Sequence, residues 1–355
     1  MENISEFKKM LFLIYKGLKH WELLKWGKVP ASLYEGQMLM IKSMVLSNRQ
    51  PPTNLYDFIQ LLYKPFESWG IKAMKDLFPL DASFLIEGYG VSAEIEDFID
   101  MYISPEENDQ SVVKQILIYC REGDLDNEYR TVRLLLSNKK NAVITAFKLK
   151  QLLDTIKDET LRQMVKKCYE EILQPIQNYR KCPHCGWTLS YQNGRWLCNK
   201  ESICRYFTSF ERLERFSNEY EDSRVYRLIP GIQRYTLLTG IIENEIFMKL
   251  KKYDSIIYPE IDRYDIAITT GGRTIHIDVK DYKSPVMLAH FFNEKPQNEL
   301  EKYQENVFVL VPNYRVKQQP GYITQFKKKL DETAKPYIQI ISERDFYKSL
   351  KEGTF

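Results

Sequence analysis

Two acids and a lysine in the C-terminal third have the residue types and spacing of a metal-assisted hydrolysis site. Asp265 begins one short run of alternating apolar residues, and Asp278-Val279-Lys280 ends another. Because side chains alternate between the two faces of a strand, Asp278 and Lys280 share one face of the second run. Acids and lysines are seldom buried on a strand unless they have a chemical role, so this face points to chemistry.

The chemistry that fits these residues is phosphodiester cleavage. Mg²⁺ binds carboxylate oxygens, water and phosphate oxygens, which makes Asp265 and Asp278 candidate ligands. Two neighbouring carboxylates repel each other when no cation lies between them. We therefore expect Mg²⁺ or Mn²⁺ as the catalytic cofactor, activating water and stabilising the leaving oxygen. Lys280 would lower the pKa of the attacking water or hold the scissile phosphate.

The elements that would position these residues are a β-hairpin and the helix before it. Two β-branched runs flank Gly271-Gly272, a pair that tolerates the positive φ of a tight turn. Residues 240–250 have helical spacing, and Glu243 lies in register with the apolar residues of one face. Glu243 is thus the predicted third carboxylate, and Glu245 is the alternative.

Together these residues resemble the PD-(D/E)XK motif of restriction endonucleases and their relatives. Asp265 and the triplet 278–280 match the motif, and Glu243 matches the acid that such nucleases often carry on a preceding helix. One position departs from the pattern, because Tyr264 precedes Asp265 where the motif has proline, and Asp262 is the alternative acid. The resemblance implies a Mg-dependent endonuclease acting on DNA, with Glu243, Asp265 and Asp278 as metal ligands.

The remaining C-terminal residues have the pattern of an α/β core. Apolar runs at 306–311 and 337–341 predict buried parallel strands. Residues 322–332 have helical spacing, and Ser342 has the position of a helix cap. Strands alternating with helices predict α/β layering. With the resemblance, this gives a restriction-endonuclease-like core with a central mixed sheet.

A cluster of cysteines predicts a structural zinc site. Two of them are separated by two residues, and the other two, further along the chain, by five. An Asn-Gly pair at 193–194 predicts a hairpin between the two pairs. Four thiolates complete a tetrahedral Zn²⁺ site, so the metal would stabilise the fold without catalysing a reaction. His184 is the alternative ligand, and the stretch resembles a zinc ribbon. The predicted zinc ligands are Cys182, Cys185, Cys198 and Cys204.

The N-terminal half is predicted to be helical and has no catalytic motif. Seven segments place apolar residues three and four apart. They are 4–22, 30–47, 55–63, 112–121, 131–136, 141–153 and 160–173. The predicted organisation is therefore a helical region (1–180), a four-cysteine zinc ribbon (181–215) and a nuclease domain (216–355).

Composition limits the class of protein. The 355 residues include 44% hydrophobic and 28% charged residues, which is typical of a soluble globular protein. No apolar run reaches the roughly 20 residues that span a bilayer, so no membrane is expected. The apolar stretch 10–15 is too short for a signal peptide and lacks its cleavage site. We expect a cytoplasmic protein, in which cysteines are reduced or bound to metal.

The order of helical region, zinc ribbon and nuclease core resembles the nuclease-type subunit encoded with prokaryotic PIWI-RE proteins, beside a helicase, in anti-phage gene islands. This resemblance implies a role in cutting foreign nucleic acid, with PIWI-like and helicase proteins as partners. An alternative from another class is a non-catalytic zinc-ribbon subunit that binds nucleic acid or serves as an adaptor. The residues leave open whether the substrate is DNA or RNA.

Overall fold

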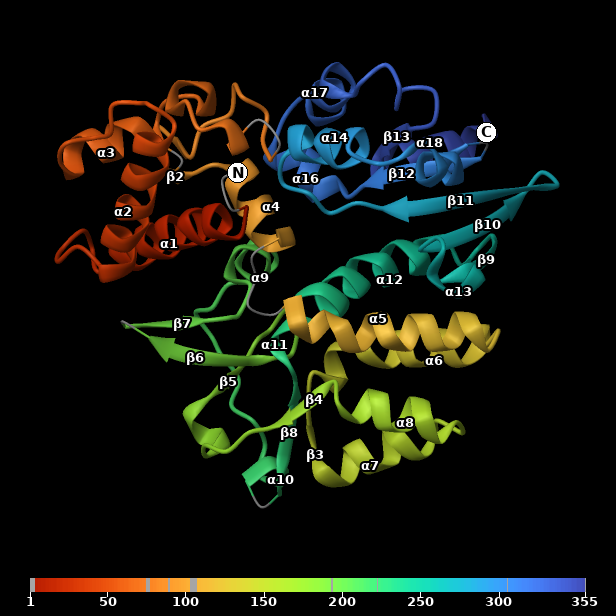
Figure 1. Cartoon of the computed structure of the whole chain (residues 1–355). Coiled ribbons are helices and arrows are strands. Elements are labelled where there is room, and N and C mark those ends of the chain that lie inside the picture. Colours follow the sequence, from red (N-terminus) through yellow and green to blue (C-terminus); the bar gives the residue numbers. More distant parts are fainter. Residues whose placement is uncertain are drawn as a thin grey trace. The chain divides into compact units, whose positions relative to one another are not determined.

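The computed structural model describes residues 4–74, 77–88, 90–102, 107–192, 194–221, 223–304 and 306–354. These residues form a mixed α/β fold (Figure 1). Contacts divide the chain into two compact units. Pro105–Val279 is called the middle unit here, and Met1–Ser104 together with Lys280–Phe355 is called the outer unit. The predicted domain limits at residues 180 and 215 stay predictions. Within the described residues, none of the helices is long and apolar enough to span a bilayer.

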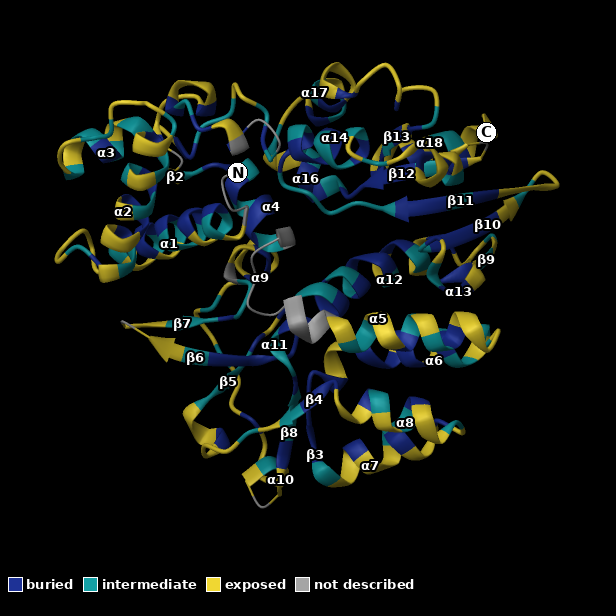
Figure 2. Ribbon diagram, viewed as in Figure 1, coloured by how far each residue is buried: buried dark blue, intermediate teal, exposed yellow. Residues whose placement is uncertain are grey.

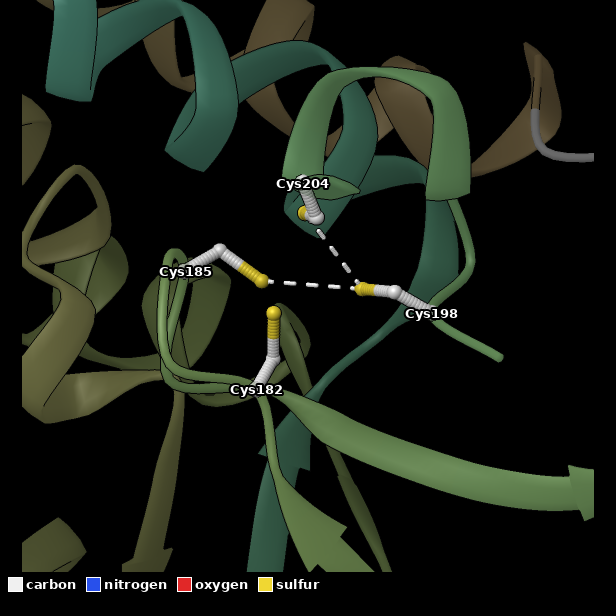
Figure 3. A group of neighbouring side chains, drawn as sticks. All are labelled: Cys182, Cys185, Cys198 and Cys204. Carbon is white, nitrogen blue, oxygen red and sulfur yellow. Dashed lines mark hydrogen bonds between the residues drawn. The ribbon is translucent and has the colours of Figure 1, made fainter. Parts of the chain in front are cut away.

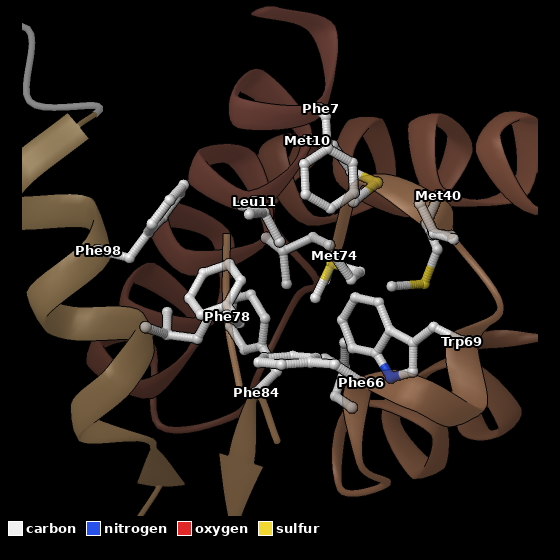
Figure 4. Close-up of a cluster of buried hydrophobic side chains, with 14 of the residues drawn as sticks. Phe7, Met10, Leu11, Met40, Phe66, Trp69, Met74, Phe78, Phe84 and Phe98 are labelled. Atoms are coloured by element: carbon white, nitrogen blue, oxygen red, sulfur yellow. The ribbon is translucent and has the colours of Figure 1, made fainter. Parts of the chain in front are cut away.

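The N-terminal part of the outer unit is helical, as predicted. Gly17 and Gly36 let the first two helices cross closely, because a Cβ on Gly17 would lie 2.6 Å from the Leu33 nitrogen. Aromatic rings fill the core beneath these helices, and the Trp69 indole donates to the Leu61 carbonyl (3.0 Å; Figure 4). The elements are α1 (Ile4–Leu23), α2 (Ala31–Leu46), α3 (Leu55–Leu62), β1 (Leu85–Ile86), β2 (Gly90–Val91) and α4 (Ala93–Tyr102).

The C-terminal part of the outer unit has the predicted alternation of strands and helices. The two predicted apolar runs pair in parallel, with Val309 opposite Ile340. The Ser342 hydroxyl accepts from the Asp345 amide and caps the last helix, as predicted. The elements are α14 (Pro285–Asn293), α15 (Gln297–Leu300), β12 (Val307–Val311), α16 (Asn313–Gln318), α17 (Tyr322–Lys329), β13 (Gln339–Ser342) and α18 (Glu343–Glu352).

The predicted hairpin lies at the end of the middle unit. Gly271 and Gly272 have φ of +55° and +75°, and they join two antiparallel strands. A third strand pairs with the first, and the helix that carries Glu243 packs on this sheet. That helix is largely buried (Figure 2). The elements are α11 (Pro230–Ile232), a π-helical segment (Gln233–Leu237), α12 (Leu238–Leu250), β9 (Asp254–Ile257), α13 (Pro259–Asp262), β10 (Ile266–Thr270) and β11 (Arg273–Val279).

The first part of the middle unit differs from the predicted run of helices. The predicted helix 141–153 begins only at residue 146, and the predicted helix 160–173 ends at residue 166. The β-branched residues 143–145 instead pair with a strand about 80 residues further along the chain. Pairing over that distance leaves no mark in local helical spacing. The elements are α5 (Glu107–Glu122), α6 (Asp126–Leu136), β3 (Val143–Thr145), α7 (Ala146–Asp154), α8 (Glu159–Lys166), β4 (Tyr169–Glu171) and β8 (Val225–Leu228).

The cysteine-containing stretch forms a small sheet followed by a helix. Gly194 has φ of +82° at the predicted hairpin turn, whereas its neighbour Asn193 lies outside the described residues. The elements are β5 (Arg180–Lys181), β6 (Thr188–Gln192), β7 (Arg195–Leu197), α9 (Glu201–Phe207) and α10 (Asn218–Glu221).

Candidate functional site

Asp265 and Asp278 meet at the open end of the β10–β11 hairpin. The strand register ends at the pair of Ile266 with Ile277, and just before it the Asp265 amide donates to the Ile277 carbonyl (3.0 Å). The Asp265 carboxylate accepts a hydrogen bond from the Val279 amide (2.6 Å), which fixes its side chain at this position. The fold thus places the Asp265 carboxylate against the backbone of the triplet that contains Asp278.

The face of β11 that carries Asp278 is polar but largely covered. Only 5% of Asp278 is exposed, so this carboxylate lies in a site from which water is mostly excluded. Beside it on the same face, the His276 ring stacks on Tyr264 (4.3 Å between centroids). Burial lowers the pKa of His276 despite the carboxylate of Glu260 3.7 Å away, so the imidazole is neutral at pH 7.

Glu243 points inward from α12, whereas the alternative Glu245 is exposed. The Tyr258 hydroxyl donates to the Glu243 carboxylate at 2.8 Å. The Arg133 guanidinium, from α6, donates to its two oxygens at 3.1 and 3.4 Å. Burial opposes the charge on Arg133, but Tyr258 and Glu243 outweigh burial and raise the pKa of Arg133 well above its usual value. Glu243 is therefore one half of a buried ion pair.

The three predicted acids do not form a compact three-ligand group. Within the described ranges, the four cysteines are the only set of three or more candidate ligands whose atoms lie within 4.8 Å of one another. The Asp265 carboxylate is held by the Val279 amide, and Glu243 is held by Arg133.

Asp262, the alternative to Asp265, belongs to the Arg133 network. Its carboxylate accepts from the Tyr129 hydroxyl at 2.5 Å and lies 4.0 Å from the Arg133 Nε. Asp262 therefore shares the Arg133 network with Glu243.

A left-handed turn connects β9 to Asp265, with φ between +49° and +59° at Tyr258, Glu260, Ile261 and Asp262. Residues with a Cβ avoid this region, at a cost of about 1–2 kcal/mol each. Side chains of α5 and α6 hold the turn: Arg121 donates to the Ile261 carbonyl (3.2 Å). The carboxylate of Asp126 accepts from the Ile261 amide (2.9 Å).

Lys280 begins the second segment of the outer unit, directly after the chain leaves the middle unit. Its amide donates to the Leu310 carbonyl (3.0 Å), and its Nζ lies 6.0 Å from the centroid of the Phe291 ring. The next residue, Asp281, is paired with the buried Arg315 (2.7 Å). These contacts fix the backbone that carries the lysine.

The four buried cysteines form a group that could hold a metal ion (Figure 3). The Sγ of Cys198 lies 3.7 Å from that of Cys185 and 3.6 Å from that of Cys204. A tetrahedral zinc with bonds of about 2.3 Å to sulfur would place the sulfurs about 3.8 Å apart. The side chains present therefore fit a four-thiolate zinc.

Each half of the cysteine group comes from a different local structure. The Cys182 amide donates to the Trp187 carbonyl (2.8 Å), which forms a tight turn. Gly186 is required in that turn, because its φ is +75° and a Cβ would lie 2.2 Å from the Lys139 oxygen. Cys198 follows β7 and Cys204 lies within α9, so a helical segment accounts for the five-residue spacing.

Two further residues lie beside the cysteine group. The alternative ligand His184 is outside the cysteine group and stacks on Phe207 (4.7 Å). Gln233 is fully buried, and its amide donates to the Sγ atoms of Cys185 (3.5 Å) and Cys198 (3.9 Å). Neither Gln233 nor Arg133 was predicted as part of a site, because glutamine and arginine at these positions match no motif.

Comparison with known proteins concerns the C-terminal third of the chain. Residues 240–353 match the family model described as "REase associating with pPIWI_RE". This region is a restriction-endonuclease-like domain. The match includes Glu243, Asp265, Asp278 and Lys280, and it links the domain to pPIWI_RE systems, as predicted. The cysteines lie outside the matched residues. No curated protein and no solved structure matches the chain.

Proposed function

We propose that this protein is a metal-dependent nuclease that hydrolyses phosphodiester bonds of DNA in defence against phage or other foreign DNA. The observation that carries the proposal is the hydrogen bond from the Val279 amide to the Asp265 carboxylate, directly beside the buried Asp278, within a restriction-endonuclease-like domain. Two neighbouring carboxylates favour a divalent cation, because like charges that lie close together repel each other.

In this proposal each residue has a separate task. Asp265 and Asp278 hold Mg²⁺ or Mn²⁺, and Glu243 serves as the third acid. The cation supplies an activated water and stabilises the leaving oxygen. Lys280 holds the scissile phosphate or lowers the pKa of the attacking water. The Val279 amide orients Asp265 for this role.

The zinc site has a structural role in the proposal. Four thiolate ligands leave no open position for a substrate, so Zn²⁺ would stabilise the fold. The name of the matched family supports a PIWI-like partner protein, and a helicase partner and a place in the cytoplasm belong to the same proposal.

Cleavage assays with matched variants test the proposal. The zinc-loaded chain is incubated with plasmid and with single-stranded DNA and RNA in Mg²⁺ or Mn²⁺, with and without the PIWI-like partner. We expect Asp278→Asn and Lys280→Ala to lower the rate at least about 100-fold, as removal of a group that acts in the transition state does. The exposed residues Asp254 and Lys251 supply the controls Asp254→Asn and Lys251→Ala. Equal rates for site and control variants would place the reaction elsewhere.

A non-catalytic adaptor is the second candidate, and one observation favours it. Glu243 is engaged by Arg133, and no three-acid group occurs among the described residues. In that case nucleic acid or a partner protein would bind without being cut, and binding would survive Asp265→Ala and Asp278→Ala.

A further inference from the structure

The β6–β7 hairpin beside the cysteine group carries an aromatic pair that is not part of the hydrophobic core. Tyr191 lies opposite Trp196 across β6 and β7, with their ring centroids 5.2 Å apart. Tyr191 is 59% exposed, although it lies between the two cysteine pairs in the sequence. The Arg180 guanidinium lies 4.9 Å from the centroid of the Trp196 ring. The Trp196 indole therefore lies near both an exposed aromatic ring and a guanidinium.

The edge of the same hairpin borders a hollow of about 450 Å³. Arg205, on α9, donates to the Trp196 carbonyl (2.9 Å), and its guanidinium lies 4.6 Å from the Phe210 ring. The exposed Arg195, at the hairpin turn, lines the hollow together with Trp196, Arg205 and Phe210. Here again, arginine side chains alternate with aromatic rings.

The charge of this stretch differs from that of the rest of the chain. Residues 176–216 contain seven Lys and Arg against three Asp and Glu, a net charge of +4. The whole chain carries only +3, so the other residues together are slightly acidic. A local excess of positive charge attracts a polyanion and repels a basic partner.

We propose that this surface, defined by Arg180, Tyr191, Arg195, Trp196, Arg205 and Phe210, binds single-stranded nucleic acid. Unpaired bases would stack on the exposed tyrosine, and the arginines would hold the phosphates, which is how strands are held without regard to sequence. Bases within a duplex are already stacked and offer no free face to a tyrosine ring. The surface would hold the substrate strand of the nuclease. Only that last role rests on the proposed function.

Fluorescence anisotropy measures binding without cleavage. The full zinc-loaded chain, with no Mg²⁺ added, is titrated into labelled oligothymidine, oligouridine and a duplex, each of about 12 nucleotides. We expect the two single strands to bind more tightly than the duplex. The relative affinities for oligothymidine and oligouridine show whether the surface prefers DNA or RNA.

Variants of exposed residues locate the binding surface. The double variant Arg195→Glu/Arg205→Glu is expected to weaken binding more than about tenfold. The slope of log affinity against log salt concentration should correspond to about two fewer phosphate contacts. Tyr191→Ala is expected to weaken binding about tenfold, and Tyr191→Phe to restore it, because the ring alone stacks. The matched controls are Lys150→Glu and Phe147→Ala on α7, where both side chains are exposed. The controls should stay within about twofold of the parent.

Retained zinc, measured for every variant, shows that the hairpin is intact. If Arg205→Glu loses zinc, Arg195→Glu and Tyr191→Ala carry the test, since both positions are exposed. The proposal is overturned if zinc-loaded surface variants bind like the parent, if the controls lose as much affinity, or if the duplex binds as tightly and Tyr191→Ala has no effect. A parent that binds through this surface but never cuts would reject the nuclease function alone. A parent that cuts, with unchanged binding by the surface variants, would reject this surface alone.

Discussion

The Arg133 guanidinium donates to both carboxylate oxygens of Glu243, at 3.1 and 3.4 Å, in a buried site between α6 and α12. The helix acid of the restriction-endonuclease-like domain is thus paired with a residue that precedes that domain in the sequence. The same arginine donates to the Thr236 carbonyl (2.9 Å), in the π-helical segment that leads into α12. Arg133 therefore fixes both the carboxylate and the start of its helix.

Replacing Arg133 should destabilise the middle unit. Arg133→Gln leaves the buried Glu243 carboxylate without its counter-charge, and losing one partner of a buried pair costs about 3–5 kcal/mol. The exposed pair of Lys348 with Glu352 supplies the control Lys348→Gln, which should cost less than about 1 kcal/mol. Urea unfolding at pH 7.5 measures both. Similar losses for the two variants would show that the Arg133 pair contributes little.

Gln233 should tune zinc affinity without being a ligand. Its amide donates to two of the sulfurs, and removing such a partner typically weakens metal binding about 10–100-fold. We expect Gln233→Ala to release zinc more readily to a competing chromogenic chelator. Gln163→Ala, at an exposed position on α8, is the matched control. Identical zinc release from the two variants would contradict a role for the amide.

Glycine should be tolerated in the left-handed turn before Asp265. Glu260 has φ of +52°, where a Cβ costs about 1–2 kcal/mol and glycine has no such cost. Glu260→Gly should therefore be neutral or stabilise by up to about 1 kcal/mol. Glu245→Gly, at an exposed position inside α12, should destabilise by about 1 kcal/mol. Thermal unfolding shows whether each variant gains or loses stability. A large loss of stability in Glu260→Gly would argue against the turn geometry.

Asp97 should make stability depend on pH. Its carboxyl group accepts from the amides of Lys283 (3.1 Å) and Ser284 (2.8 Å), shortly after Lys280 in the sequence. Burial raises the pKa of Asp97 from 3.8 to about 7, although Arg315 acts in the opposite direction. The folded state therefore holds a proton that the unfolded state has lost between about pH 4 and 7, so stability falls as the pH rises through this range.

Urea unfolding between pH 5 and 8 measures this dependence. The slope attributable to Asp97 is at most about 1.4 kcal/mol per pH unit, and Asp97→Asn should remove it. Asp81→Asn, at an exposed ion pair with Lys329, should leave the curve parallel to that of the parent. A parent whose stability rises across this range, with no change in Asp97→Asn, would contradict the buried proton.

Several features could be predicted from the sequence because their signals are local. The alternation of Ile275 and Ile277 with His276 and Asp278, and the glycine pair at 271–272, predicted the hairpin. The Cys182-x-x-Cys185 spacing predicted a turn that directs two sulfurs to one point. Strand period, turn conformation and knuckle geometry each involve only neighbouring residues, so a single sequence is enough to specify them.

Other features were decided by the tertiary structure, because they join residues far apart in the chain. Residues 143–145 pair as a strand only because β8 lies beside them, and local spacing alone predicted a helix there. The pairing of Arg133 with Glu243 spans 110 residues, and the contact of Gln233 with Cys185 spans 48. Because the fold buries these residues together, Arg133 pairs with a candidate catalytic acid and Gln233 donates to the cysteine sulfurs. No pattern in the sequence specifies which distant side chains meet in this way.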